Sequence, residues 1–279
     1  MISKTPETPI EVVKEGETNH KVQSSNLKVK SNHKVQSSNL KVQSKESSNL
    51  KVQSKLKALL SSTYFGPIQW YQKLNRYDEC LIERHESFIK QTYRNRMIIP
   101  TTNGPLSLTI PTNHNTSLAM KDIRISDHAN WRHVHWNALL SAYGESPFFE
   151  YYQDDIRPFF EKKYEFLFDF NMETTEKMIE LLDIRPKISI TDEYILSEER
   201  RVKSEEFDSI ADHKVQSSNL KVPSIVDFRD AIRPKKPLPD AEFAPQRYYQ
   251  VYEQKYGFLP NMSILDLLFN EGNEAIFYL

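Results

Sequence analysis

The chain has 279 residues, of which 37 are basic and 38 acidic. Because these charges nearly cancel, there is no broad positive field of the kind that binds nucleic acid. A single cysteine, Cys80, excludes an internal disulfide and a multi-cysteine metal site. No apolar leader is present and no stretch approaches the roughly 18 apolar residues of a membrane span. We therefore expect a cytoplasmic protein with no nucleic-acid partner, membrane span or metal site.

A ten-residue string, HKVQSSNLKV, occurs at 20–29, 33–42 and 213–222, and a truncated copy occupies 47–54. The copies have no fixed period, which excludes a solenoid, and they are too polar to build a core. We interpret them as inserted repeats, tolerated where nothing packs. The sequence thus predicts a disordered low-complexity tail over 1–57, one α/β domain over 58–279, and a long flexible loop with little core over about 194–240.

In the first half of the domain, apolar runs and turn residues predict mainly strands. LKALLSS (56–62) suits a buried strand, and after Gly66 and Pro67 a short helix follows at 68–74. DECLI predicts a second strand at 79–82, in which Cys80 is either inert core or, alternatively, a nucleophile. Two β-rich runs, 94–100 and 105–111, flank Asn103-Gly104, a strong hairpin signal. A further strand is expected at 121–125.

The second half contains three predicted helices before the long loop. The first starts near Trp131, the second is capped by Ser146 and carries an aromatic stripe from Phe149, and the third spans 173–183. A strand follows at 187–191. After the loop, helices are predicted at 248–256 and at 264–270, the latter with a capping box of Ser263 and Asp266 and a terminal Gly272. The last five residues, AIFYL, suit a strand.

This order of strands and helices predicts an α/β fold, a single mixed-sheet layered domain with flanking helices. None of the common catalytic or phosphate-binding motifs occurs, including GxGxxG, the Walker loop, GxSxG, HExxH and CxxC. With only six glycines, the chain has little room for a glycine-rich phosphate loop. We expect no bound cofactor.

Two weaker patterns suggest a polar site. Arg94 and Arg96 flank Asn95, and on a strand their side chains would stand about 6.6 Å apart on one face. Such a pair suits a phosphate or carboxylate, although a solvated strand face has the same pattern. The string Glu83-Arg84-His85-Glu86 directly follows the second predicted strand. The carboxyl end of a strand is where an α/β protein places acid–base groups, so His85 and Glu86 are candidates; a charged turn is the alternative.

A third pattern lies in WRHVHW (131–136). His135 shares a helical face with Trp131 and points inward, whereas His133 lies about 160° round the helix. Two histidines spaced in this way cannot share one metal, so His135 is either a general base or a hydrogen-bonded core histidine. Tyr64, beside Gly66 and Pro67, either shapes a ligand crevice or belongs to a simple turn. Asn270 can cap a helix end or contact a ligand.

Several strings together resemble the WbqC-like family, whose bacterial members are encoded among surface-polysaccharide (O-antigen) genes. They are YFGPIQWYQKL (64–74), YRNR (93–96), NGPLSLTIP (103–111), WRHVHWNALLSAYGESPFF (131–149) and PNMSILDLLFNEG (260–272). Many members carry Gln-Pro before the tyrosine, where this chain has Ser62-Thr63. The resemblance implies a cytoplasmic protein that modifies sugar precursors. It assigns no established catalytic residue to this chain.

Two functional interpretations remain open. In the first, the chain is a transferase acting on a nucleotide-linked or phosphorylated sugar. His135, His85 and Glu86 are then the candidate acid–base groups, and the candidate substrate ligands are Arg94, Asn95, Arg96, Tyr64 and Asn270. In the second, it is a non-catalytic binding or assembly protein that uses its aromatic surface and the long loop. The sequence leaves the oligomeric state undetermined.

Overall fold

A computed structural model describes residues 56–113, 118–196 and 225–279. The repeat copies and nearly all of the predicted tail lie outside these residues, as does the middle of the predicted loop. The described strands are β1 Lys57–Ser61, β2 Glu79–Glu83, β3 Arg96–Thr101, β4 Gly104–Thr109, β5 Thr112–Asn113, β6 Arg124–Ile125, β7 Ile188–Ile190 and β8 Ile225–Asp227. The described α-helices are α1 Ile68–Arg76, α2 Trp131–Tyr143, α3 Phe149–Ile156, α4 Pro158–Glu161, α5 Leu167–Leu181, α7 Glu253–Tyr256 and α8 Ile264–Glu271.

The main sheet has four parallel strands in the order β7-β2-β1-β8. Its two central strands are apolar on both faces, as buried parallel strands are, and Cys80, Ile82 and Leu60 have no exposed surface. Burial raises the pKa of the Cys80 thiol to about 12, so this side chain is inert core rather than a nucleophile. The predicted α/β architecture is confirmed.

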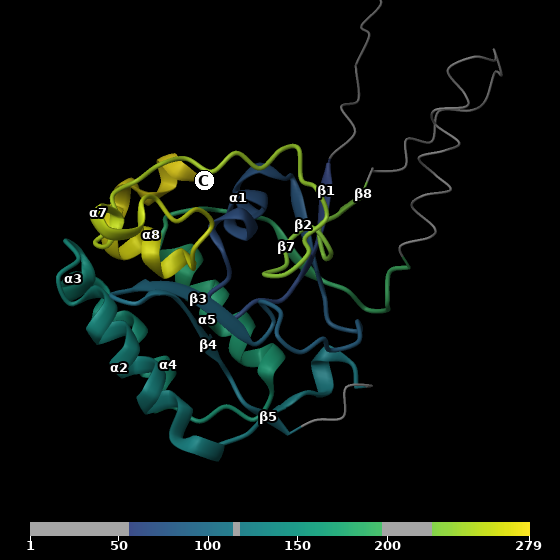
Figure 1. Cartoon of the computed structure of the whole chain (residues 1–279). Coiled ribbons are helices and arrows are strands. Elements are labelled where there is room, and N and C mark those ends of the chain that lie inside the picture. Colours follow the sequence, from purple (N-terminus) through teal and green to yellow (C-terminus); the bar gives the residue numbers. More distant parts are fainter. Residues whose placement is uncertain (1–55, 114–117, 197–224) are drawn as a thin grey trace, which may run out of the picture. The chain divides into compact units, whose positions relative to one another are not determined.

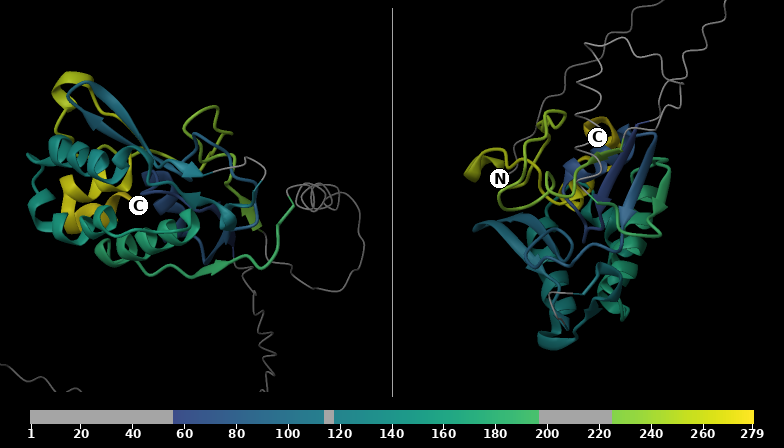
Figure 2. Two further views of the ribbon diagram at one scale, coloured as in Figure 1. Left: turned by 90° about the horizontal axis from the view of Figure 1, so that it is seen from below. Right: turned by 90° about the vertical axis from the view of Figure 1, so that its right-hand side faces the viewer.

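The antiparallel pairs form two further small sheets, β3-β4 and β5-β6. The predicted hairpin forms: Thr102 and Asn103 join β3 to β4, and Gly104 begins β4 opposite Thr101 with a φ of 96°. In Figure 1 the hairpin lies between the parallel sheet and helix α2, which β3 contacts; Figure 2 gives two further views of the ribbon. The core is rich in aromatic side chains, including Tyr64, Phe65, Trp131 and Phe170.

Four predicted elements differ in the structure. The region 194–240 is not all loop, because β8 pairs with β1 and buries Phe228 and Ile232 behind it; three residues between charged and proline-bearing neighbours give too short a pattern to detect. Helix α5 begins six residues before the predicted start, since its first turn buries Leu167 and Phe168. Only Glu253–Tyr256 is helical within 248–256. The C-terminal strand is wrong, because a 3-10 helix, η4 (Gly272–Tyr278), follows α8 directly.

Smaller corrections concern caps and strand ends. Ser146 does not cap the helix after it, which starts behind Phe148 without a side-chain cap. Of the strand expected at 121–125 only β6 forms, after a 3-10 turn, η1 (Met120–Asp122). Ser263 caps α8 by accepting a hydrogen bond from the Leu265 amide at 3.4 Å. The Asp266 side chain, however, bonds to Tyr248 and Gln250 instead of completing a capping box.

Gly272 should be intolerant of any side chain. It ends α8 at a φ of 57°, and a Cβ there would meet the Phe148 ring at 2.7 Å. Gly257 also has a positive φ, 70°, but its Cβ would meet nothing within 4 Å. Both alanine variants carry backbone strain, of the order of 1–3 kcal/mol, and only Gly272→Ala adds overpacking of about 1–3 kcal/mol. Urea unfolding should rank Gly272→Ala clearly below Gly257→Ala in stability; equal losses would contradict the packing.

Candidate functional site

Polar side chains gather where three parallel strands end. In the register of the sheet Ser61 pairs with Glu83, and Asp227 pairs with Leu59 two residues earlier on β1. The carboxyl ends of β1, β2 and β8 therefore share one edge, which is where open α/β sheets bind ligands. We call the polar residues at this edge the carboxyl-edge cluster; its members are Ser61, Glu83, Glu86, Arg94, Asp227 and Arg229.

The best-connected pair in this cluster is Glu86 with Arg94. Arg94 Nε donates to Glu86 Oε1 at 2.8 Å, and Arg94 Nη2 donates to Glu86 Oε2 at 2.5 Å and to Ser61 Oγ at 2.8 Å. This is the two-point geometry by which arginine binds carboxylates. Arg94 is only 3% exposed and Glu86 only 5%. Both charged groups are thus shielded from water and bonded to each other.

Glu83, Arg229 and Asp227 form a second set of charged side chains in this cluster, beside the pair of Glu86 and Arg94. Glu83 has no exposed surface and accepts hydrogen bonds from Thr191 Oγ1 and from the His85 amide, each at 2.8 Å. Arg229 Nη1 lies 3.8 Å from a Glu83 oxygen, and Arg229 Nε donates to Asp227 Oδ1 at 3.1 Å. The cluster therefore places two guanidinium groups and three carboxylates at one edge of the sheet.

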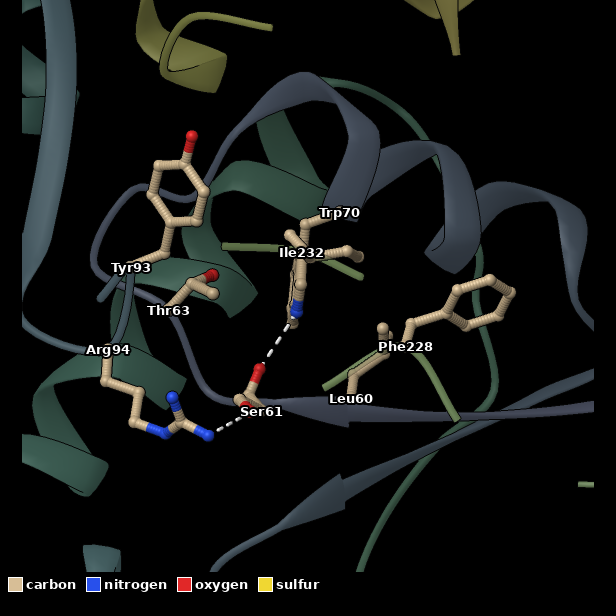
Figure 3. A pocket seen from close by; sticks show the side chains of 8 residues that line it. All are labelled: Leu60, Ser61, Thr63, Trp70, Tyr93, Arg94, Phe228 and Ile232. Atoms are coloured by element: carbon tan, nitrogen blue, oxygen red, sulfur yellow. Dashed lines mark hydrogen bonds between the residues drawn. The ribbon is translucent and has the colours of Figure 1, made fainter. Parts of the chain in front are cut away.

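A small cavity adjoins Ser61 and Arg94 (Figure 3). It holds about 10 Å³, roughly the space of one water molecule. The Thr63 hydroxyl lines it and is buried without a hydrogen-bond partner in the described part of the chain. The other lining residues are Leu60, Trp70, Tyr93, Phe228 and Ile232. The site thus contains an unsatisfied polar group beside the arginine, under an apolar cover.

The turn after β1 is conformationally constrained. Phe65 has a φ of 39°, which is uncommon for a residue with a side chain, and a Cβ on Gly66 would overlap the Thr63 side chain. The first amides of α1 are already bonded, Ile68 N to the Met262 carbonyl and Gln69 N to Asn261 Oδ1. The start of α1 is therefore not an anion site, unlike the first helix of many nucleotide-binding folds.

The structure separates Arg94 and Arg96. Arg94 precedes β3, so the shared strand face predicted for the pair does not form, and Arg94 is not on a solvated face either. Arg96 is half-buried and donates through Nε to Thr109 Oγ1 at 3.0 Å. Asn95 donates to the Ile110 carbonyl. His85 is half-buried next to Glu86 and accepts from Arg84 Nε at 3.2 Å. Binding and catalytic roles for these residues stay predictions.

Tyr64 and His135, predicted for different roles, are brought together. The Tyr64 hydroxyl lies 2.9 Å from His135 Nδ1, and both side chains are buried among Trp131 and Phe170. Burial lowers the pKa of His135 to about 4, against a smaller opposing effect of the Thr109 backbone. The imidazole is thus neutral at pH 7. These contacts are those of a core histidine, and its role as a base stays a prediction.

Asn270 belongs to another polar group, inside α8. Its Nδ2 donates to the Asp266 carbonyl at 2.7 Å. The fully buried Asp266 carboxylate accepts from the Tyr248 hydroxyl at 2.5 Å and from Gln250 Nε2 at 2.8 Å. Burial raises the pKa of Asp266 to about 6 even though these donors favour the charged form. The Asn270 side chain therefore bonds to the last turn of its own helix, and ligand contact by this side chain stays a prediction.

The sequence had missed half of the cluster. Asp227 ends β8 and Arg229 follows it, in the region interpreted as loop, and their local sequence pattern does not predict that strand. Ser61 and Thr63 carried a usable signal, because the small polar run Ser-Ser-Thr follows a buried strand directly. Within the described ranges, no group of three or more histidine, cysteine or acidic side chains could hold a metal ion. Nor is any described helix long and apolar enough to cross a membrane.

His135→Gln should destabilise the fold and change its pH dependence. Its folded pKa of about 4 lies below the ordinary 6.5. The unfolded chain therefore binds the extra proton, and stability is lost as pH falls from about 6.5 toward 4. The variant should lose about 1–3 kcal/mol relative to the wild type at pH 7, and urea unfolding should show this difference shrink as pH falls from about 6.5 toward 4. His133→Gln, exposed on the same helix, is the control; similar profiles for both variants would show that His135 is not buried as described.

Asp266→Asn should shift stability in the opposite sense. Its folded pKa of about 6 exceeds the ordinary 3.8, so the folded state holds the proton longer and stability is lost as pH rises from about 4 to 6. The stability of the wild type relative to Asp266→Asn should fall by roughly 3 kcal/mol over that range. Asp169→Asn, an exposed acid in the first turn of α5, should show no such trend. A constant difference would contradict the burial of Asp266.

Comparison with known proteins agrees with the resemblance in the sequence. The family model described as WbqC-like protein family matches residues 61–278. The chain is also similar to an uncharacterized protein, Rv1507c, of Mycobacterium tuberculosis, with 26% identity over 229 residues, 81% of this chain and 97% of the relative. No solved structure matches. The family match includes the turn after β1, the carboxyl-edge cluster and α8, and the chain belongs to the WbqC-like protein family.

Proposed function

We propose that this protein is a transferase that acts on an anionic sugar precursor, phosphorylated or nucleotide-linked, in surface-polysaccharide biosynthesis, and that the substrate binds at the carboxyl-edge cluster. The observation that carries the proposal is the burial of Glu86, Arg94, Glu83 and Arg229 at the edge where parallel sheets bind ligands. Buried ion pairs stabilise a fold poorly, because apolar residues of similar size often do as well or better. Charges concentrated at this place therefore favour a functional role.

In this proposal Arg94 is the anion ligand and Glu86 is its partner in the unliganded protein. A phosphate can accept the same two parallel hydrogen bonds from Arg94 that Glu86 accepts now. Substrate binding then releases the Glu86 carboxylate next to the bound sugar. A carboxylate freed in this way can take a proton from an acceptor hydroxyl or amine, with the half-buried His85 beside it as the alternative base.

Substrate access requires a change in the cover of the cavity. The space beside Arg94 holds only about one water molecule, and Phe228 and Ile232 close it from the segment after β8. That segment is held to α1 by Lys73, whose Nζ lies 2.9 Å from Asp240 Oδ2 and 3.1 Å from Glu242 Oε2. Lys73 Nζ also lies 4.2 Å from the centroid of the Phe228 ring, so opening the cavity by moving Phe228 would break this contact as well.

The competing function is that of a non-catalytic binding or assembly protein. Two aromatic side chains, Tyr151 and Phe277, are about three-quarters exposed, at 73% and 75%. Exposed aromatic residues are common at protein interfaces. Under this alternative the carboxyl-edge cluster is structural and binds no small anion.

The test is ligand-dependent stabilisation of the whole chain. Melting temperatures are measured with UDP-glucose, glucose 1-phosphate and neutral glucose, because a ligand of the native state raises stability by about 2.7 kcal/mol at one hundred times its Kd. This corresponds to a shift of roughly 5–10 °C for a domain of this size. The anionic ligands should stabilise the protein and glucose should not. Absence of any shift across anionic sugars would favour the assembly function.

The matched variants are Arg94→Lys and Arg185→Lys. Lysine keeps the charge opposite Glu86 but loses the two-point geometry, so Arg94→Lys should weaken binding by about 1.5–3 kcal/mol. Arg185 has a side chain 91% exposed, and Arg185→Lys should bind normally. Circular dichroism confirms that each variant is folded before binding is compared. Equal affinities for both variants would remove Arg94 from the site.

A further inference from the structure

A second site lies on the outer side of helix α2, in a groove of about 310 Å³. Helices α2 and α4 pack against each other here (Figure 1). Its volume is at the lower end of the range of small-molecule pockets, about 300–1,000 Å³. His135 faces the core from α2, whereas His133 and Trp136 of the same helix line the groove. The full lining is Asn130, Arg132, His133, Trp136, Arg157, Phe160, Glu161 and Lys163.

Positive charge dominates this lining. Arg132, Arg157 and Lys163 are cationic, and Glu161 is the one carboxylate among the lining residues. The pair of Arg157 with Glu161 and the pair of Lys163 with Asp127 lie at the surface, with the cations 57% and 79% exposed. Surface pairs of this kind are worth at most about 1 kcal/mol. Both cations can therefore exchange their present partner for an anionic ligand at little cost.

Arg132, which lines the groove, contributes a further hydrogen-bond donor. Its Nε donates to the Lys162 carbonyl at 3.1 Å and its Nη1 to Asp127. Its Nη2 is buried and has no hydrogen-bond partner among the described residues. A buried donor without an acceptor is costly, and Arg132 is one of the residues that line the groove. An anion there would satisfy it.

Two of the residues that line the groove, Trp136 and Phe160, are aromatic. Trp136 is half-buried and its ring contacts Phe160, at 5.8 Å between centroids. Both residues line the groove, so a ligand meets apolar ring surface beside the cations. This combination suits a ligand with an apolar ring face and an anionic substituent. A neutral sugar would gain no ion pair, and inorganic phosphate alone would gain no ring contact.

From these features we infer that the groove between α2 and α4 binds a phosphorylated or carboxylated sugar, at a site separate from the carboxyl-edge cluster. Arg157 and Lys163 supply the exchangeable cations, Arg132 supplies the buried donor, and Trp136 packs against the sugar ring. The inference stands whether or not the carboxyl-edge cluster is catalytic.

Trp136 is a natural reporter for this site. Of the three tryptophans, Trp131 is 4% exposed, Trp70 is 1% exposed and lines the cavity beside Arg94, and Trp136 is half-buried and lines the groove. Titration of the full chain with glucose 1-phosphate, glucuronate, inorganic phosphate and glucose, followed by tryptophan fluorescence and by calorimetry, measures binding, and the part of the fluorescence change that is lost in Trp136→Phe reports binding in the groove. Saturable changes are expected with glucose 1-phosphate or glucuronate, and which of them binds tighter identifies the anionic group. Inorganic phosphate should bind at least tenfold more weakly, and glucose should not bind.

Variants assign the binding to the groove. Arg157→Ala and Lys163→Ala remove exposed side chains, so both variants should fold and each should weaken binding about five- to tenfold. Arg185→Ala, an exposed arginine outside the groove, should leave the affinity measured by the Trp136-dependent fluorescence change unaltered. Trp136→Phe should abolish this fluorescence change while calorimetry still detects binding. The inference is overturned if no anionic sugar saturates the fluorescence change, if glucose binds equally well, or if Arg185→Ala weakens binding as much as Arg157→Ala.

Discussion

The turn that follows the first strand is the constraint on which the rest of this structure depends. In seven residues, 61–67, it bonds to four helices and to the carboxyl-edge cluster. Ser61 accepts from Arg94 through its hydroxyl and from Trp70 Nε1 of α1 through its carbonyl. Further along, Ser62 meets Asn171 of α5, Tyr64 meets His135 of α2, and the carbonyls of Phe65 and Gly66 accept from residues 263 and 264 at the start of α8.

These bonds join segments almost two hundred residues apart in the sequence, so the conformation of the turn depends on contacts from across the domain. The unusual backbone of Phe65 follows from this, because a strained conformation persists only where its surroundings determine it. The carboxyl-edge cluster inherits its geometry from the same turn. Ser61, which holds Arg94, and Thr63, which lines the cavity, sit on either side of one residue, Ser62.

Two buried titratable groups flank this arrangement and respond to pH in opposite senses. His135 is held neutral, and the fold loses stability as pH falls through the range in which His135 gains its proton. Asp266 is held protonated up to about pH 6, and the fold loses stability as pH rises through the range in which Asp266 loses its proton. Both ranges lie between about pH 4 and 6.5, so the two contributions largely cancel. A flat pH profile of the unmodified protein is thus compatible with two strongly perturbed groups.

Much of the fold could be predicted from the sequence, and the reasons are local. Continuous apolar runs marked β1 and β2, Asn103-Gly104 marked the hairpin, and Ser263 with Gly272 marked both ends of α8. β8 could not be predicted, because its three residues owe their conformation to pairing with β1. The C-terminal 3-10 helix had the composition of a strand but no neighbouring strand to pair with.

The candidate site was predictable only in part, for a related reason. Residue types at a strand end suggested Glu86 and Arg94 separately, but their mutual bond depends on how the segment between β2 and β3 folds back over Ser61. Arg229 enters from a strand that the sequence concealed. The pairing of Tyr64 with His135 joins two positions that had been assigned to different roles. Tertiary contacts decided each of these cases.

The two proposed anion sites also differ in how they can meet an anion. Arg94 is fully desolvated and already bonded, so a ligand must displace Glu86 and bring enough hydrogen bonds to leave no buried charge unpaired. For the binding proposed at the carboxyl-edge cluster, that requirement implies selectivity and little dependence on salt. Arg157 and Lys163 stand in water, where ions screen charges beyond about 8 Å at physiological ionic strength, so the binding inferred for the groove is easily gained and easily weakened by salt. On these two proposals, the buried cluster is suited to discriminate between anionic ligands, and the open groove is suited to hold an anionic sugar loosely at the surface.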